Sequence, residues 1–125
     1  MIAADTSSLI NFLEGAGTPD AQRVRQALRA DQLWLSPPTK TELLSRPVIG
    51  AEFEELVLGA RMLAITPGYW DRAGHSRRLI LSKGLRARLA DTLIAQCCID
   101  VGAPLITSDS DFRHFERWCG LKLAA

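Results

Sequence analysis

The sequence lacks a long hydrophobic run. Apolar residues make up 47% of the chain, but charged residues interrupt them throughout. No run approaches the roughly 18 apolar residues that would suggest a membrane span, so we expect no membrane contact. The N-terminus, Met-Ile-Ala-Ala-Asp, also lacks a basic segment followed by an apolar one, and a secretory signal is therefore not expected. A cytoplasmic location is the default expectation.

Cysteine and histidine are also scarce, with three and two residues respectively. Cys97, Cys98 and Cys119 form no Cys-x-x-Cys pair, and neither histidine stands in a His-Glu-x-x-His spacing. A structural zinc site and a zinc hydrolase are therefore poorly supported. We expect the cysteines to be reduced thiols that pack as small hydrophobic side chains.

The chain has little net charge, only +1, which argues against a protein that coats nucleic acid nonspecifically. Its charges are nevertheless unevenly distributed. The segment 72–88 contains no acidic residue but holds Arg72, Arg77, Arg78, Lys83, Arg86 and Arg88. This segment is either a surface that contacts phosphates or a basic, solvated helix face and loop, and the sequence favours neither.

Short apolar runs alternate with helical patterns along the whole chain, and its 125 residues fit one domain, 1–125. Strands are predicted at Met1–Ala4, Leu33–Ser36, Met62–Thr66, Pro104–Thr107 and Leu121–Leu123. Helices are predicted at Ser7–Glu14, Asp20–Ala30, Pro37–Leu44, Ala51–Arg61, Pro67–Ser82, Leu89–Val101 and Ser110–Trp118. Such alternation predicts an α/β fold with a central parallel sheet of about four to five strands, flanked by helices on both faces.

Acidic residues stand where the apolar stretches end, at Asp5, Glu42, Asp91, Asp109 and Asp111. In an open α/β sheet the carboxyl ends of the strands share one edge, so these carboxylates can converge on one crevice. Carboxylates that lie together repel one another, and a divalent cation would neutralise them. The sequence therefore predicts a metal site.

Each acid taken alone has a simpler interpretation. An Asp near a helix start can cap free backbone amides, and Thr39-Lys40-Thr41-Glu42 matches a capping box. Hydroxyls at Thr6 and Thr107 are likewise more typical of caps than of a site. The convergence at one sheet edge favours the metal site, because caps would be scattered over both edges.

Four sequence blocks together resemble PIN-domain ribonucleases, and VapC-type toxins in particular. The blocks begin at Asp5 (Asp-Thr-Ser-Ser-Leu-Ile), Thr41 (Thr-Glu-Leu-Leu), Ala90 (Ala-Asp-Thr-Leu-Ile-Ala) and Leu105 (Leu-Ile-Thr-Ser-Asp-Ser-Asp-Phe). Each block alone is weakly specific. Their combination, in the order and near the spacing of the family, covers almost the full chain and is specific.

The resemblance implies a single PIN-like domain that hydrolyses RNA with Mg²⁺, or Mn²⁺ as a substitute. Its catalytic acids would be Asp5, Glu42, Asp91 and Asp109, with Asp5, Asp91 and Asp109 on the metal and Glu42 acting through a water. Asp111 is a weaker candidate, because it fits the first turn of a helix equally well. The resemblance also implies a second copy of the chain and an antitoxin that presents an Arg to the acidic site.

Three other functions fit less well. A phosphorelay receiver domain would need an Asp after the third strand and a Lys after the last major one, and the sequence has Thr-Pro and Ser-Asp there. A phosphatase with an Asp-x-Asp-x-Thr motif would need an acid at Ser7. A PIN-like module that binds RNA or a partner without cutting remains the alternative, although binding alone requires no cluster of four like charges.

Overall fold

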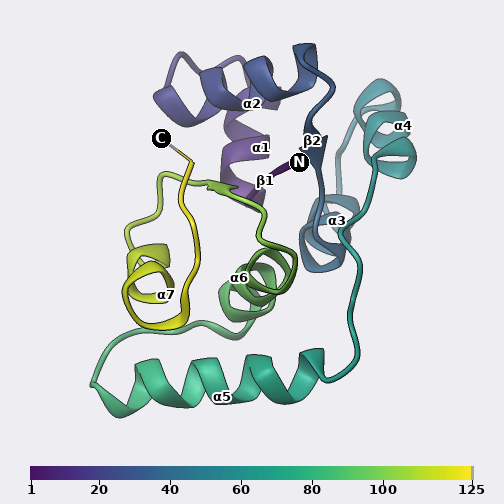
Figure 1. Cartoon of the computed structure of the whole chain (residues 1–125). Helices are drawn as coiled ribbons and strands as arrows, with labels where there is room; N and C mark the ends of the chain where they lie inside the picture. The colour runs from purple at the N-terminus through teal and green to yellow at the C-terminus, as the bar shows by residue number, and fades with distance from the viewer. Residues whose placement is uncertain (125) are drawn as a thin grey trace.

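The structure is a computed structural model that describes residues 1–124. Over this range the chain forms three short strands and seven helices (Figure 1). In chain order they are β1 (Ile2–Ala4), α1 (Thr6–Leu13), α2 (Pro19–Arg29), β2 (Leu33–Trp34), α3 (Pro37–Leu44), α4 (Ala51–Gly59), α5 (Tyr69–Ser82), α6 (Leu89–Val101), β3 (Leu105–Ile106) and α7 (Phe112–Cys119). The predicted α/β fold is thus confirmed.

The sheet is parallel, with β1 between β2 and β3. Ala3 pairs with Trp34 on one side and with Leu105 on the other. Because all three strands run in the same direction, their carboxyl ends lie at one edge. Asp5 directly follows β1, and Asp109 and Asp111 lie in the segment that follows β3.

The prediction of four to five strands was wrong for the described residues, in which three strands form the sheet. Met62 and Leu123 each contribute one isolated parallel bridge, to Leu35 and Leu105 respectively. The first ladder cannot extend beyond Leu35, because Pro37 begins α3 and has no N–H to donate. The second ends because β3 itself ends at Ile106.

Helices cover both faces of the sheet, as predicted. Neighbouring strand residues belong to different apolar clusters, with Ala3 and Leu105 in one and Ala4 and Ile106 in the other. This alternation follows from the two-residue period of a strand. Figure 1 shows α5, α6 and α7 on one side of the sheet and α1 and α2 on the other.

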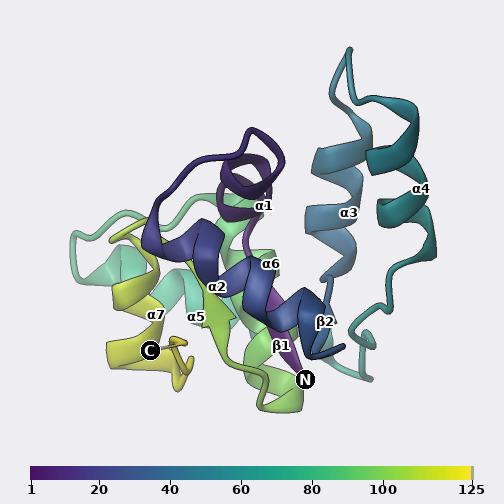
Figure 2. The ribbon, with the colours of Figure 1, turned by 90° about the horizontal axis from the view of Figure 1, so that it is seen from above.

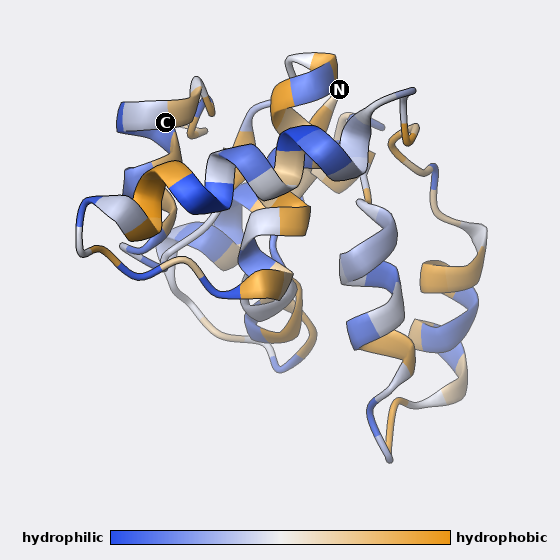
Figure 3. Cartoon of the chain, turned by 90° about the horizontal axis from the view of Figure 1, so that it is seen from below, coloured by the Kyte–Doolittle hydropathy of each residue, from blue (hydrophilic) through white to orange (hydrophobic). Residues whose placement is uncertain are grey.

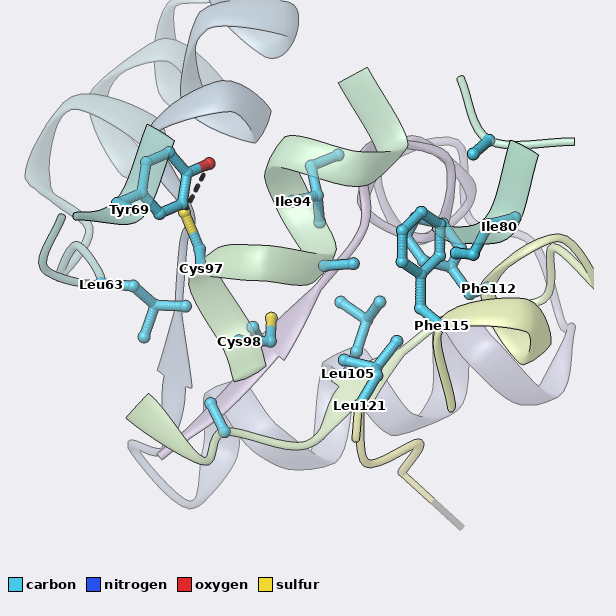
Figure 4. Packing of buried hydrophobic residues seen from close by; sticks show 14 residues of the cluster. Leu63, Tyr69, Ile80, Ile94, Cys97, Cys98, Leu105, Phe112, Phe115 and Leu121 are labelled. Atoms are coloured by element: carbon cyan, nitrogen blue, oxygen red, sulfur yellow. Dashed lines mark hydrogen bonds between the residues drawn. The ribbon is translucent and has the colours of Figure 1, made fainter. Parts of the chain in front are cut away.

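The cluster beneath α5, α6 and α7 is packed around three fully buried aromatic side chains, Tyr69, Phe112 and Phe115 (Figure 4). The Tyr69 hydroxyl donates a 2.6 Å hydrogen bond to the Leu93 carbonyl, so its polar end is satisfied inside the core. Cys97 lies beside it, 3.5 Å from the same hydroxyl. Cys97, like its neighbour Cys98, is free and fully buried, as the sequence predicted.

Helices α3 and α4 lie side by side as a pair at one edge of the molecule (Figure 2). Hydrophilic and hydrophobic residues alternate along the helices (Figure 3). This pattern is typical of helices that pack with one face against the rest of the fold and expose the other face to solvent. No helix within residues 1–124 is long and apolar enough to cross a membrane.

A buried acid links α1 to α2. The Asp20 carboxylate is 2% exposed and accepts a 3.0 Å hydrogen bond from the Asn11 amide. Burial alone would raise the pKa of Asp20, but the polar groups of Thr18, Asn11 and Ser8 outweigh it and lower the pKa to about 2. Because the folded state favours the ionised form, Asp20 stabilises the fold above its unfolded pKa, and this contribution disappears as the pH falls toward 2.

We therefore expect Asp20→Asn to lower the free energy of unfolding at about pH 7 by about 2 kcal/mol, and by clearly less at about pH 3. Urea denaturation at the two pH values measures the difference. Asp71→Asn, which removes an exposed acid from the first turn of α5, is the matched control. An equal loss at both pH values would show that the charge of Asp20 does not contribute.

Candidate metal centre

Asp5 is the first residue after β1 and the N-cap of α1. Its carboxylate is 3% exposed, and its Oδ1 atom accepts a 2.9 Å hydrogen bond from the Ser8 backbone N–H. This is the capping role that the sequence offered as the simpler interpretation. The cap does not exclude a second role, since each carboxylate oxygen has two lone pairs.

The Thr107 hydroxyl connects two of the acidic blocks. It donates a 2.6 Å hydrogen bond to Asp5 Oδ2 and accepts a 3.0 Å hydrogen bond from the Asp109 backbone N–H. Asp109 Oδ1 in turn accepts a 2.9 Å bond from the Asp111 N–H. Thr107 therefore fixes the orientation of Asp5 and the start of the loop that carries Asp109.

Three carboxylates meet at this edge of the sheet. Asp91, Asp109 and Asp111 each place one oxygen so that all three oxygens lie within 4.8 Å of one another. Asp91 comes from the first turn of α6, Asp111 is the N-cap of α7, and Asp109 lies in the loop between β3 and α7. Asp5, Asp91 and Asp109 also line one hollow of about 240 Å³. Of the expected metal ligands, Asp91 and Asp109 belong to the group of three clustered oxygens, together with Asp111, whereas Asp5 shares the hollow with them but is not part of that group.

Glu42 lines the same hollow, from α3. The capping-box interpretation of Glu42 was wrong, because α3 begins at Pro37 with Ser36 as its N-cap. The Ser36 hydroxyl, not a residue of the predicted box, accepts the hydrogen bond from the Thr39 N–H at 3.3 Å. Glu42 is therefore inside the helix, where its Oε1 atom accepts a 2.6 Å hydrogen bond from the Thr6 hydroxyl.

Asp91 is the member of the group whose negative charge is unfavourably placed. Burial raises its pKa to about 6, and the nearby charges of Asp109, Asp5 and Glu42 act in the same direction, whereas the positive charge of Arg88 opposes them. Among the described residues, no group forms a hydrogen bond with the buried Asp91 Oδ2 atom. A buried carboxylate oxygen without a donor is energetically unfavourable unless a cation or another ligand satisfies it.

The donor set fits a hard divalent cation. The three clustered residues offer only carboxylate oxygens, which Mg²⁺ and Mn²⁺ prefer, and no thiolate or imidazole belongs to the cluster. The unpartnered Asp91 oxygen supports the same conclusion, because a bound cation would offset both the repulsion and the missing hydrogen bond.

Two hydroxyls that the sequence favoured as helix caps belong to the site. Thr6 and Thr107 both donate to acidic side chains, Glu42 and Asp5 respectively. The available signal was their position at the carboxyl end of a strand, since Thr6 directly follows Asp5 and Thr107 lies two residues before Asp109. Arg88, which the sequence placed either on a phosphate-contacting surface or on a solvated basic face, lines the hollow itself.

The basic segment 72–88 does not form one continuous free surface. Arg72 pairs with Asp100 at 2.7 Å, and the Lys83 ammonium lies 3.8 Å from the centre of the Trp118 ring. Arg77 donates a 2.9 Å hydrogen bond from Nε to the Ala87 carbonyl. Arg86 Nη1 lies 4.0 Å from Asp111 Oδ2. Four of the six basic side chains therefore have partners within the fold, while Arg78 and Arg88 are exposed.

Removing the Asp91 charge should reveal the metal site without any assay of activity. In chelator at about pH 7.5, we expect Asp91→Asn to be more stable than the original chain by about 1–3 kcal/mol, because its ionised carboxylate is disfavoured by burial and repulsion. Mn²⁺ should raise the melting temperature of the original chain and leave that of Asp91→Asn unchanged. Thermal melting with and without Mn²⁺ measures both effects.

Asp71→Asn, which removes an acid that does not line the hollow, serves as the control and should respond to Mn²⁺ as the original chain does. A lower melting temperature for Asp91→Asn in chelator would contradict the unfavourable placement of this charge. An equal Mn²⁺ response in Asp91→Asn would contradict its role as a ligand.

Comparisons with known proteins agree with this geometry. Residues 2–117 match the family model of the PIN domain. A similar solved structure is that of VapBC2 from Rickettsia felis bound to a DNA fragment from their promoter, with 21% identity, a TM-score of 0.73, and 99% of this chain and 98% of that chain covered.

Two further structures have the same fold. FitAcB from Neisseria gonorrhoeae is 12% identical, with a TM-score of 0.68, and 100% of this chain and 97% of that chain are covered. DNA-bound VapBC from Salmonella typhimurium is 20% identical, with a TM-score of 0.67 and 99% and 98% covered. No curated protein matches the sequence. The family-model match over nearly the whole chain shows that this chain belongs to the PIN domain family.

Proposed function

We propose that this chain is a Mg²⁺- or Mn²⁺-dependent endoribonuclease that hydrolyses RNA phosphodiester bonds as the VapC-type toxin of a toxin–antitoxin pair. The observation that carries the proposal is the group of Asp91, Asp109 and Asp111 oxygens within 4.8 Å, together with the unpartnered Asp91 Oδ2. Membership in the PIN domain family and the likeness to VapBC structures support it. The substrate would be RNA of the cytoplasm.

The proposed ligands are Asp5, Asp91 and Asp109, with Asp111 as a further oxygen donor. When bound, the cation would supply an acidified water as nucleophile and offset negative charge on the phosphate. Thr107 holds Asp5 in place through its 2.6 Å hydrogen bond, so the ligand is positioned before any ion binds. Preorganisation of this kind reduces the reorganisation needed during the reaction.

Glu42 is the proposed base that orients the attacking water and accepts its proton. The Thr6 hydroxyl fixes Oε1 by a 2.6 Å hydrogen bond and leaves Oε2 free to accept from water. Glu42 is exposed, so a water molecule can reach it.

We propose an antitoxin as the regulatory partner. The similar structures from Rickettsia felis and Salmonella typhimurium are VapBC assemblies, which supports a partner of this kind for the present chain. A segment of the antitoxin that presents an Arg to the hollow would compensate the carboxylates, because a guanidinium forms two parallel hydrogen bonds with a carboxylate. Such a segment would also block access for RNA.

A second copy of the chain is the other proposed partner. An apolar hollow of about 350 Å³ is lined by side chains of α3, α5 and α6 and the segment before α5, including Pro37, Ile65 and Trp70. Trp70 is 65% exposed and Ile65 is 40% exposed. Exposed apolar side chains around a hollow are typical of protein interfaces, and Trp is enriched at their centres.

The enzymatic proposal is tested by cleavage of total cellular RNA by the purified chain with Mg²⁺ or Mn²⁺, followed by sequencing of new 5′ ends. We expect discrete cuts that disappear with chelator and fall by at least about 100-fold in Asp91→Asn, because this change removes a charge that positions the cation. Asp71→Asn should cut as the original chain does.

Absence of cuts from a folded chain that binds Mn²⁺ and is free of antitoxin, tested also with intact ribosomes as substrate, would overturn the nuclease proposal. It would favour the alternative of a PIN-like binding module.

The dimer is tested by Trp70→Glu, which places a charge at the apolar hollow. We expect light scattering after size exclusion to give a dimer for the original chain and a monomer for Trp70→Glu, with unchanged circular dichroism, because burying an unpaired charge is strongly unfavourable. Leu81→Glu, at an exposed site of α5 outside the hollow, is the matched control and should remain dimeric. A dimeric Trp70→Glu would exclude this surface.

A further inference from the structure

Arg88 lies at the acidic hollow, where its charge acts on Asp91 without a direct ion pair. It lines the hollow together with Glu42, Asp91 and Asp109, and it is the N-cap of α6. Within residues 1–124, its guanidinium forms no hydrogen bond and no ion pair within 4.0 Å. The N–H donors of this exposed guanidinium are therefore available to a ligand of opposite charge.

The backbone around Arg88 is held on both sides. The preceding carbonyl, that of Ala87, accepts the 2.9 Å hydrogen bond from Arg77 Nε, and the Ala87 side chain is 4% exposed in the core. The Arg88 carbonyl accepts a 2.9 Å hydrogen bond from the Thr92 N–H and a 2.8 Å bond from the Thr92 hydroxyl. The Arg88 backbone is thus fixed, and only its side chain needs to adjust on binding.

The position of this charge fits a substrate phosphate. The hollow contains carboxylates from separate segments, which repel a polyanionic strand, and a single divalent cation offsets only part of that charge. A guanidinium offers paired N–H donors that match the oxygens of a phosphate. Arg86 Nη1 lies 4.0 Å from Asp111 Oδ2, so its charge is partly engaged.

Other basic residues of the segment 72–88 are less available. Arg72 is bound to Asp100 and to the Thr66 hydroxyl, and Lys83 lies on the Trp118 ring. Arg78 is exposed but does not line the hollow. Arg88 is the basic side chain that lines the acidic hollow, as far as residues 1–124 show.

We propose that Arg88 binds a phosphate of the RNA strand in the acidic hollow and that Arg77 is a positioning residue, which holds Arg88 in place through the Ala87 carbonyl. The proposal rests on the proposed function, because it takes RNA as the substrate. It assigns the recognition of the strand at the site to one named side chain rather than to the whole basic segment.

The test measures RNA binding rather than cleavage. All variants are made in the Asp91→Asn background, and the probe is a fluorescently labelled, unstructured single-stranded RNA followed by anisotropy over a series of salt concentrations. We expect Arg88→Gln to weaken binding about tenfold and to reduce the slope of log K against log salt by about 0.7, as loss of one phosphate contact predicts for a single strand. Arg88→Lys should keep the slope and lose part of the affinity, since it keeps the charge without the fork.

Arg29→Gln is the matched control, because it removes one exposed Arg from the last turn of α2, which lines a different hollow. It should keep the slope. If Arg88→Gln and Arg29→Gln bind RNA equally well, Arg88 is not the phosphate contact. The inference alone then fails, provided that the original chain still cuts RNA. If the original chain neither binds nor cuts RNA, the inference and the proposed function both fail.

The role of Arg77 is tested by a double-mutant cycle. Arg77→Gln should weaken binding in the background that keeps Arg88 and should add nothing when Arg88 is already Gln, because both changes remove the same contact. A purely structural role for Arg77 predicts that its effect persists in the absence of Arg88. Such additive losses would overturn the positioning role, with melting temperatures confirming that each variant is folded.

Discussion

The hydrogen bond from the Thr107 hydroxyl to Asp5 is the contact on which the rest of the site depends. At 2.6 Å it joins residues that are 102 positions apart and ties the end of β1 to the end of β3. The same hydroxyl receives the Asp109 N–H, and the same carboxylate caps α1. A displacement of either strand would therefore move the first helix and the Asp109 loop together, and the acids would lose their common position.

Asp5 and Asp91 are the same residue type in opposite situations. Asp5 is almost fully buried but accepts hydrogen bonds from Ser8 and Thr107, so its charge is satisfied by the fold. Asp91 is less buried, yet one of its oxygens lacks a donor within the described chain and its pKa is raised to about 6. The first arrangement stabilises the fold, whereas the second makes it less stable and is typical of a functional group.

The order of strands and helices could be predicted from the sequence, because it depends on local apolar patterns and on Pro and Gly. Asp5 and Asp91 could be placed at one sheet edge for the same reason. The extent of strand pairing could not be predicted, because the partner of Leu35 is Met62, which is distant in the sequence. The ladder between them ends there because Pro37 begins α3 and has no N–H to donate. Glu42 was misread as a possible cap because its hydrogen-bond donor, Thr6, lies 36 residues away.

In the basic segment 72–88, too, the sequence does not show which charges are paired within the fold. Arg72 and Arg88 are indistinguishable in the sequence, but Arg72 is neutralised by Asp100, 28 residues away, while Arg88 faces the acids of the hollow. A charge paired within the fold contributes little to binding an external anion, because the ligand would have to replace an existing partner. Phosphate recognition therefore depends on the basic side chains that the fold leaves unpaired at the site. The number of basic residues in the segment overestimates how many can contact a phosphate.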